Sequence, residues 1–133
     1  MVLGIEELVG VDRAGIYVIS APCMSSPKIY KIGKSVNLRK RLDQYQLAFP
    51  YGFLVELLWI FPRRLTNAKY ELGKVERFIQ NNLEMVQTTT RRARTEWYTN
   101  EKIEIVDAFL EAFKRFGHIG GQLENPSTAF THA

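Results

Sequence analysis

Two short segments near the N-terminus carry the apolar, β-branched and aromatic residues that are typical of strands. They cover residues 15–20 (GIYVIS) and 28–33 (KIYKIG), and the turn-forming segment APCMSSP separates them. This pattern predicts an antiparallel hairpin with a long loop. A third apolar run, FLVELLWIF at residues 53–61, predicts a largely buried strand that ends before Pro62.

Three other segments repeat their apolar residues with the period of a helix. The first covers residues 36–46, with Ser35 as its expected N-cap. The second begins at Thr66 or Asn67 and runs to about Leu83, and the third covers residues 101–116 after a cap at Asn100. The expected buried positions are Leu38, Leu42 and Tyr45 in the first helix, Ala68, Leu72, Val75, Ile79 and Leu83 in the second, and Ile103, Val106, Leu110 and Phe113 in the third.

The order of these elements, ββαβαα, predicts an α+β fold in which helices flank a small three-stranded antiparallel sheet. We expect residues 1–13 to be a lead-in and residues 14–116 to form one domain. From residue 117 the composition turns to Gly, Ser, Thr and Pro, which predicts a frayed, flexible tail over residues 117–133.

Composition excludes several classes of protein. The longest apolar runs are shorter than the ~20 residues of a membrane helix, and the acidic start MVLGIEELVG lacks the basic region of a secretory signal. Cys23 is the only cysteine, and the two histidines, His118 and His132, lie near the C-terminus. We therefore expect a soluble protein of the cytoplasm or nucleus that has no disulfide and no zinc site.

The net charge of +4 is unevenly distributed along the chain. Residues 28–41 contain Lys and Arg but no acidic residue, and a second basic cluster lies in TTTRRAR at residues 88–94. Such patches indicate a polyanionic partner, most simply nucleic acid. A solvated basic face is the alternative, and charge alone does not decide between the two.

Several residues have positions that packing alone does not require. Lys31 shares a strand face with Gly33, although lysine is rarely buried. Glu76 borders the apolar stripe of the second helix, and Glu71 borders the same stripe from the other side as a competing candidate. Tyr17 lies within the first strand, and Arg41 lies at the edge of the apolar stripe of the first helix.

These residues occur in an order that resembles the GIY-YIG endonuclease family. Gly15-Ile16-Tyr17 matches the first half of the family signature, and Lys31-Ile32-Gly33 aligns with the second half. The segment GKSVNLRKRL looks like the arginine-bearing helix of the family, with Arg41 at the signature arginine, and Glu76 matches the metal-binding glutamate. The reading YKIG and the element EWY at residues 96–98 resemble the viral and phage-type branch.

The resemblance implies a metal-dependent endonuclease acting on duplex or branched DNA. In this scheme Tyr17 is the general base, Arg41 clamps the scissile phosphate, and Glu76 binds Mg²⁺ or Mn²⁺. Lys31 would favour the phenolate of Tyr17, because a nearby cation favours the charged form of an acid. The expected nucleic-acid-binding residues are Lys34, Asn37, Arg39, Lys40, Arg91, Arg92 and Arg94.

The sequence departs from the family at the second signature tyrosine, where it has Lys31. Tyr30 falls on the opposite strand face, and a bulge would be needed to bring it inward as a further catalytic candidate. Two alternatives therefore stay open: a nucleic-acid-binding module that has lost cleavage, and an adaptor that binds protein around Trp97 and Tyr98. The oligomeric state, the preferred sequence and the choice between DNA and RNA are also left open.

Overall fold

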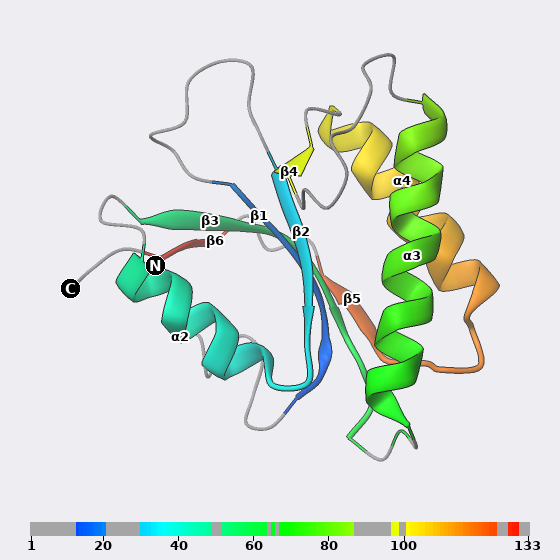
Figure 1. Cartoon of the computed structure of the whole chain (residues 1–133), viewed down its shortest axis with the longest axis horizontal. Coiled ribbons are helices and arrows are strands. Elements are labelled where there is room, and N and C mark those ends of the chain that lie inside the picture. Colours follow the sequence, from blue (N-terminus) through cyan, green and yellow to red (C-terminus); the bar gives the residue numbers. More distant parts are fainter. Residues whose placement is uncertain are drawn as a thin grey trace.

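The structure is a computed structural model in which residues 13–20, 30–48, 52–63, 65, 67–86, 97–98, 101–124 and 128–130 are described. An antiparallel sheet forms its centre, with α2 on one face and with α3 and α4 on the other (Figure 1). The elements are β1 (Gly15–Ser20), β2 (Tyr30–Ser35), α2 (Leu38–Ala48), β3 (Phe53–Ile60), α3 (Ala68–Val86), β4 (Trp97–Tyr98), α4 (Lys102–Arg115), β5 (Gln122–Glu124) and β6 (Thr128–Phe130).

β1 is a central strand, and all six of its residues are buried. It pairs antiparallel with β2 in an unbroken register from Gly15↔Ser35 to Ser20↔Tyr30. On its other side it pairs with β3, where the register shifts between Val18 and Ile19. The predicted hairpin and the predicted buried third strand are therefore confirmed.

Alternation along the strands divides the core into two clusters. One cluster lies between the sheet and α3 with α4, and it includes Ile16, Val18, Ile32, Val75 and Phe109. The other lies between the sheet and α2, and it includes Tyr17, Ile19, Leu38, Leu42 and Phe53. Most positions of the apolar stripes predicted for the first two helices are buried, namely Leu38, Leu42, Leu72, Val75, Ile79 and Leu83. Tyr45 and Ala68, which were also expected to be buried, are partly buried.

The N-caps differ from those predicted. α2 begins at Leu38, and the amide of Lys40 donates to Oδ1 of Asn37 (3.1 Å), so Asn37 caps the helix instead of Ser35. Ser35 shapes the turn before it, because its hydroxyl bonds both the carbonyl and the amide of Asn37. Glu101 is the N-cap of α4 through a capping box with Glu104, and Asn100 lies outside the described residues.

The buried face predicted for α4 is wrong. The helix buries Ile105, Ala108, Phe109 and Ala112, whereas Ile103 and Leu110 are exposed. Val106 and Phe113 are partly buried at the margin of the core. α4 is apolar over more than half of its circumference, so periodicity alone did not identify the side that packs on the sheet.

The sheet has more strands than the three predicted, and part of the segment expected to be a frayed tail belongs to it. Gly120 and Gly121, with φ of 73° and 98°, lead the chain from α4 into β5. β5 pairs with Trp59 and its neighbours in β3, and β6 pairs with the beginning of β3. The two-residue strand β4 pairs with β2, so the sheet has six strands in the order β4-β2-β1-β3-β5 with β6 also on β3.

These three additional strands are only two or three residues long. Their pairing depends on backbone hydrogen bonds to strands already in place, and such short segments have no apolar pattern to detect. A side chain also helps to hold β5, because Nε1 of Trp59 donates to the carbonyl of Gly120 (3.0 Å). Among the described residues, no helix is both long enough and apolar enough to cross a membrane.

Candidate active site

Tyr17 lies across the backbone of Gly33, its partner in the β1–β2 register. A Cβ added to Gly33 would come within 2.2 Å of the phenolic oxygen of Tyr17. Gly15 is constrained in the same way, because its added Cβ would come within 2.2 Å of the carbonyl oxygen of Trp59. Both glycines of the signature are therefore explained by close approach, and Gly33 gives the Tyr17 phenol its place.

The hydroxyl of Tyr17 is hydrogen-bonded to the hydroxyl of Tyr45, with 2.5 Å between the two oxygens. Tyr45 comes from α2, and its ring meets that of Tyr17 edge-to-face at 5.6 Å and that of Phe53 at 6.2 Å. Sequence reasoning counted Tyr45 as part of an apolar stripe and missed this polar role. The available signal was its position four residues after Arg41, on the same side of the helix.

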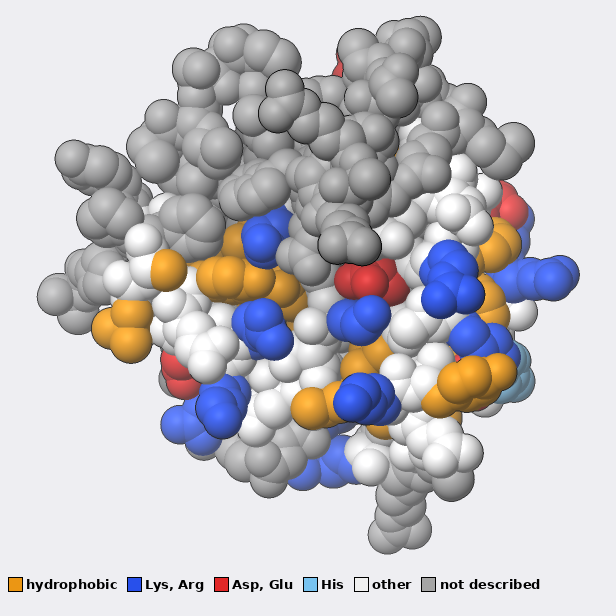
Figure 2. All heavy atoms as spheres, viewed as in Figure 1, with side chains coloured by type: hydrophobic (Ala, Val, Ile, Leu, Met, Phe, Trp, Pro, Cys, Tyr) orange, Lys and Arg blue, Asp and Glu red, His pale blue; other side chains and the backbone are white. Residues whose placement is uncertain are grey.

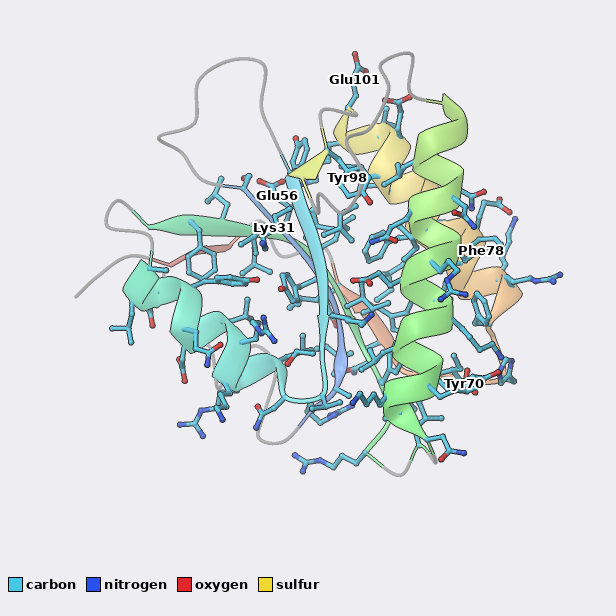
Figure 3. All side chains as sticks on the ribbon, viewed as in Figure 1. Lys31, Glu56, Tyr70, Phe78, Tyr98 and Glu101 are labelled. Atoms are coloured by element: carbon cyan, nitrogen blue, oxygen red, sulfur yellow. The ribbon has the colours of Figure 1, made fainter. Side chains whose placement is uncertain are left out.

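Lys31 lies on the same face of the sheet as Tyr17, on the side that faces α2 (Figure 3). Its ammonium nitrogen is 5.7 Å from the centroid of the Tyr45 ring, a cation–π distance. The Lys31 ammonium therefore lies over the Tyr45 ring, and the Tyr45 hydroxyl in turn is hydrogen-bonded to the Tyr17 phenol. This arrangement links Lys31 to Tyr17 through Tyr45.

Tyr30 does not join this group. It is buried in the other core cluster, beside α3 and α4, and it pairs with Tyr98 across β2 and β4. The register between β1 and β2 has no bulge that would turn Tyr30 toward Tyr17. The structure therefore leaves Lys31, and not Tyr30, beside the candidate base.

Glu76 of α3 forms an ion pair with Lys34 of β2, with 3.0 Å between Nζ and Oε1. The Glu76 side chain is 12% exposed and that of Lys34 is 44% exposed. The competing carboxylate, Glu71, has its Oε2 3.8 Å from Nε2 of His118. Of the two candidates on α3, Glu76 is therefore the one beside the signature strand.

Gly33 and Lys34 are neighbours in β2, and they connect the two halves of the site. Gly33 contacts the phenol of Tyr17 on the face toward α2, and Lys34 holds Glu76 on the face toward α3. Within the described residues, β4 pairs with Tyr30 and Lys31 of β2 and not with the following part of the strand. Tyr17 and Gly33 are buried and the Glu76 side chain is 12% exposed, whereas that of Lys34 is 44% exposed, so Lys34 is the most solvent-accessible of these four residues.

The remaining cations of the predicted site lie on α2 or before it. Arg41 and Lys40 are exposed, and Arg39 is partly exposed with its Nε 3.9 Å from Asp43. Figure 2 shows blue side chains over α2, β2 and α3 on one face, with an acidic group among them. Arg91, Arg92 and Arg94 lie outside the described residues, and Asn37 uses its side-chain oxygen to cap α2.

The donor set around Glu76 limits the metals that it can hold. The described residues contain no group of three or more His, Cys, Asp or Glu side chains that could hold a metal ion. One carboxylate fits Mg²⁺ or Mn²⁺ with water and phosphate in the other positions, since Mg²⁺ commonly takes one or two protein carboxylates. Lys34 already occupies one of the Glu76 oxygens and would have to share it or move.

A second buried carboxylate, Glu56, was not predicted. It lies near the end of β2 that pairs with β4 (Figure 3) and is 3% exposed. Its oxygens accept a hydrogen bond from Oγ of Ser20 and pair with Nζ of Lys102, both at 3.0 Å. Lys102 is the first residue of α4, so this pair fastens the start of α4 to β3.

A sheet flanked by helices, with a tyrosine, cations and a glutamate around β2, is consistent with a nuclease-like α+β domain. The chain belongs to the T5orf172 domain family, whose sequence profile matches residues 14–115. This membership supports a nuclease-like domain of phage type. No curated protein and no solved structure shows significant similarity to the chain.

Proposed function

We propose that this protein is a GIY-YIG-type endonuclease that hydrolyses phosphodiester bonds of DNA with the help of Mg²⁺ or Mn²⁺. The observation that carries the proposal is the convergence at β2: the Tyr17 phenol lies over Gly33, and Glu76 is held by the next residue, Lys34. Membership of a nuclease-like phage family supports the same conclusion.

The proposed reaction is the addition of water to the scissile phosphorus. The phenolate of Tyr17 accepts a proton from the water as the new P–O bond forms. The bond from phosphorus to the leaving sugar oxygen breaks, and that oxygen takes up a proton from solvent. A phenolate oxygen can only accept a hydrogen bond, so in this state the Tyr45 hydroxyl is the donor of the bond between the two oxygens, and the charge of Lys31 favours the phenolate. In this mechanism, Lys31, which replaces the second signature tyrosine, stabilises the phenolate of the general base.

The cations bind the phosphate on which charge develops. Arg41 is exposed and has the planar fork that suits a phosphate group, so it is the proposed clamp on the scissile phosphate. Lys34 is positioned to contact a phosphate while it remains close to Glu76. A Mg²⁺ or Mn²⁺ ion held by Glu76 would supply Lewis-acid stabilisation of the phosphate oxygens.

The test of this proposal is a supercoiled-plasmid nicking assay with Mg²⁺, Mn²⁺ or EDTA. Wild-type protein should nick only with metal, and Glu76→Ala should lose nicking while it keeps its fold. Glu71→Ala is the matched control, because it removes the other carboxylate of α3, which lies near His118. Equal nicking by Glu76→Ala and wild type would refute the proposed metal role.

The second candidate function is DNA binding without cleavage. It is favoured by Lys31 in place of the signature tyrosine and by the burial of Tyr30 in the opposite core cluster. Under this alternative the protein binds DNA with a strong salt dependence, but branched, single-stranded and duplex substrates all stay intact with either metal.

A further inference from the structure

The solvent-facing side of α3 differs from an ordinary solvated helix. Of the α3 side chains that the structure describes, the exposed ones include no carboxylate. Figure 2 shows blue groups over α3 on the face that also carries the blue groups over β2 and α2. The exposed residues are Lys69, Tyr70, Lys74, Arg77 and Asn81.

The two described carboxylates of α3 are turned inward, and each lies near a basic group. Glu76 is paired with Lys34, and Glu71 lies 3.8 Å from His118. These two carboxylates therefore contribute little negative charge to the outer face of the helix. A solvated helix face commonly mixes both signs of charge, whereas this one presents cations only among its described side chains.

An exposed aromatic ring lies among these cations. Tyr70 is 65% exposed and projects from the first turn of α3 (Figure 3). The ammonium of Lys74 lies 5.1 Å from the Tyr70 ring centroid and 5.9 Å from that of Phe116. Phe116 in turn packs edge-to-face on Phe78 at 5.6 Å. Lys74 is therefore held between two rings, and it steadies the Tyr70 ring at the surface.

We propose that this outer surface of α3, formed by Lys69, Tyr70, Lys74 and Arg77, binds single-stranded DNA. The lysines and the arginine contact phosphates, and one unpaired base stacks on the ring of Tyr70. Single-stranded DNA fits better than duplex, because paired bases already have both faces stacked, whereas an unpaired base offers a face to an aromatic side chain. The inference rests on the proposed function, since the strand bound here would continue from the site at β2.

The distance along α3 is short enough for one DNA strand to contact both Tyr70 and the site at β2. Glu76 faces β2, and Tyr70 lies six residues earlier on the exposed side. Six residues span about 9 Å along the helix axis, a separation that a single strand covers within a few nucleotides. The surface would therefore prefer DNA with an unpaired strand beside the cut, such as a flap or a branch.

The test measures binding of labelled DNA in EDTA, where cleavage does not interfere. The probes are oligo-dT, a strand of the same length made of abasic units, and a duplex of that length. Wild type should bind oligo-dT about tenfold more tightly than the abasic strand, as expected for one stacked base. Tyr70→Ala should bind the two strands equally, with less than a twofold change for duplex.

Two comparisons separate the ring from the charge. Tyr70→Phe keeps the ring and should keep the preference for oligo-dT. The double change Lys69→Gln and Arg77→Gln should weaken binding of both strands and make the dependence of affinity on salt shallower. Lys114→Gln is the matched charge control, because Lys114 is an exposed lysine of α4 beside Glu111, and it should leave that dependence unchanged.

The inference is overturned if Tyr70→Ala retains the wild-type preference for oligo-dT over the abasic strand. The inference is also overturned if a triple variant binds DNA as tightly as wild type does. This variant carries Tyr70→Ala, Lys69→Gln and Arg77→Gln, and such a result would mean that the outer face of α3 is only solvated. These results are independent of nicking. A protein that never nicks DNA but loses its base preference on Tyr70→Ala would refute the endonuclease and retain the α3 surface.

Discussion

The phenolic oxygen of Tyr17 lies where the side chain of residue 33 would begin, and Gly33 leaves that space open. The two residues are direct partners in the β1–β2 ladder. Tyr17 and Gly33 therefore form one unit, in which the missing side chain of Gly33 leaves room for the Tyr17 ring.

Gly33→Ala should displace the Tyr17 phenol. A methyl group at this position forces the ring or the strand to move, and overpacking of this kind costs about 1–3 kcal/mol of unfolding free energy. Denaturant unfolding and nicking should be measured together, and nicking should fall further than stability accounts for. Gly73→Ala is the control for stability, because nothing lies within 4 Å of its added Cβ, and it should stabilise α3 by about 0.5–1 kcal/mol. Wild-type nicking by Gly33→Ala would contradict the assigned role of Tyr17.

Tyr17→Phe and Tyr45→Phe should differ in severity. Loss of a general base lowers kcat by about 10²–10⁴-fold, so Tyr17→Phe should be nearly inactive. Tyr45→Phe removes one hydrogen bond to the base, and a hydrogen bond to a charged group contributes about 1.5–3 kcal/mol, which corresponds to a loss of at least about tenfold. Single-turnover cleavage gives both numbers, and DNA affinity should change little in either variant. A more severe defect in Tyr45→Phe would transfer the base role to Tyr45.

Lys34→Gln tests the ion pair with Glu76. Because the Lys34 side chain is 44% exposed, solvent screens the pair, and unfolding free energy should fall by no more than about 1 kcal/mol. Mn²⁺ binding, measured by electron paramagnetic resonance without DNA, should tighten because the carboxylate no longer has a competing cation. DNA affinity should fall, with a shallower dependence on salt. Unchanged Mn²⁺ binding would indicate that Lys34 does not compete for Glu76.

The ion pair between buried Glu56 and partly exposed Lys102 predicts an asymmetry between two single changes. Lys102→Met should destabilise the protein more than Glu56→Leu, because the first change leaves a buried carboxylate without its cation. The double variant should recover much of the loss, since an apolar pair of similar volume is often nearly neutral. Urea unfolding of the three variants checks this order, and equal losses in both single variants would argue against it.

Removal of β5 and β6 should affect the whole sheet. A chain that ends at Gly117 lacks both strands that pair with the outer side of β3, and it exposes the backbone of an apolar strand. Such an edge promotes association between chains, so we expect a lower Tm and oligomers in size-exclusion chromatography. A chain that ends at Phe130 keeps both strands and is the control. A monomeric truncated chain with an unchanged Tm would show that β5 and β6 are dispensable.

The sequence predicted the elements whose pattern is strong and local. The hairpin, the strand at 53–60 and the stripes of α2 and α3 depend on apolar periodicity, and the signature residues fall on them in the predicted order. The short strands β4, β5 and β6 were missed because they depend on backbone pairing with a partner distant in sequence. The buried face of α4 was missed because Ile103 and Leu110 are as apolar as the residues that pack inside.

The sequence indicated which residues of the candidate site share a strand or helix face, but it did not indicate their side-chain contacts. Tyr17, Lys31 and Glu76 were selected by position, and the structure adds that Lys31 lies over the ring of Tyr45 and that Glu76 pairs with Lys34. The alternation of residues along a strand predicts on which face of the sheet a side chain lies. It does not give the side chain that reaches it from another element, and for this reason Tyr45 and Glu56 became visible only in the fold.

The central position of β1 has a consequence for the motion of the site. Tyr17 belongs to a strand that is paired on both sides, and amides of such strands exchange with solvent mainly through global unfolding. Arg41 and Lys34 lie on an exposed helix surface and at a strand edge. Native-state hydrogen exchange should therefore find the proposed base in the slowest-exchanging part of the chain. The groups that receive the phosphate would lie in parts that open more readily and can adjust to the shape of each substrate.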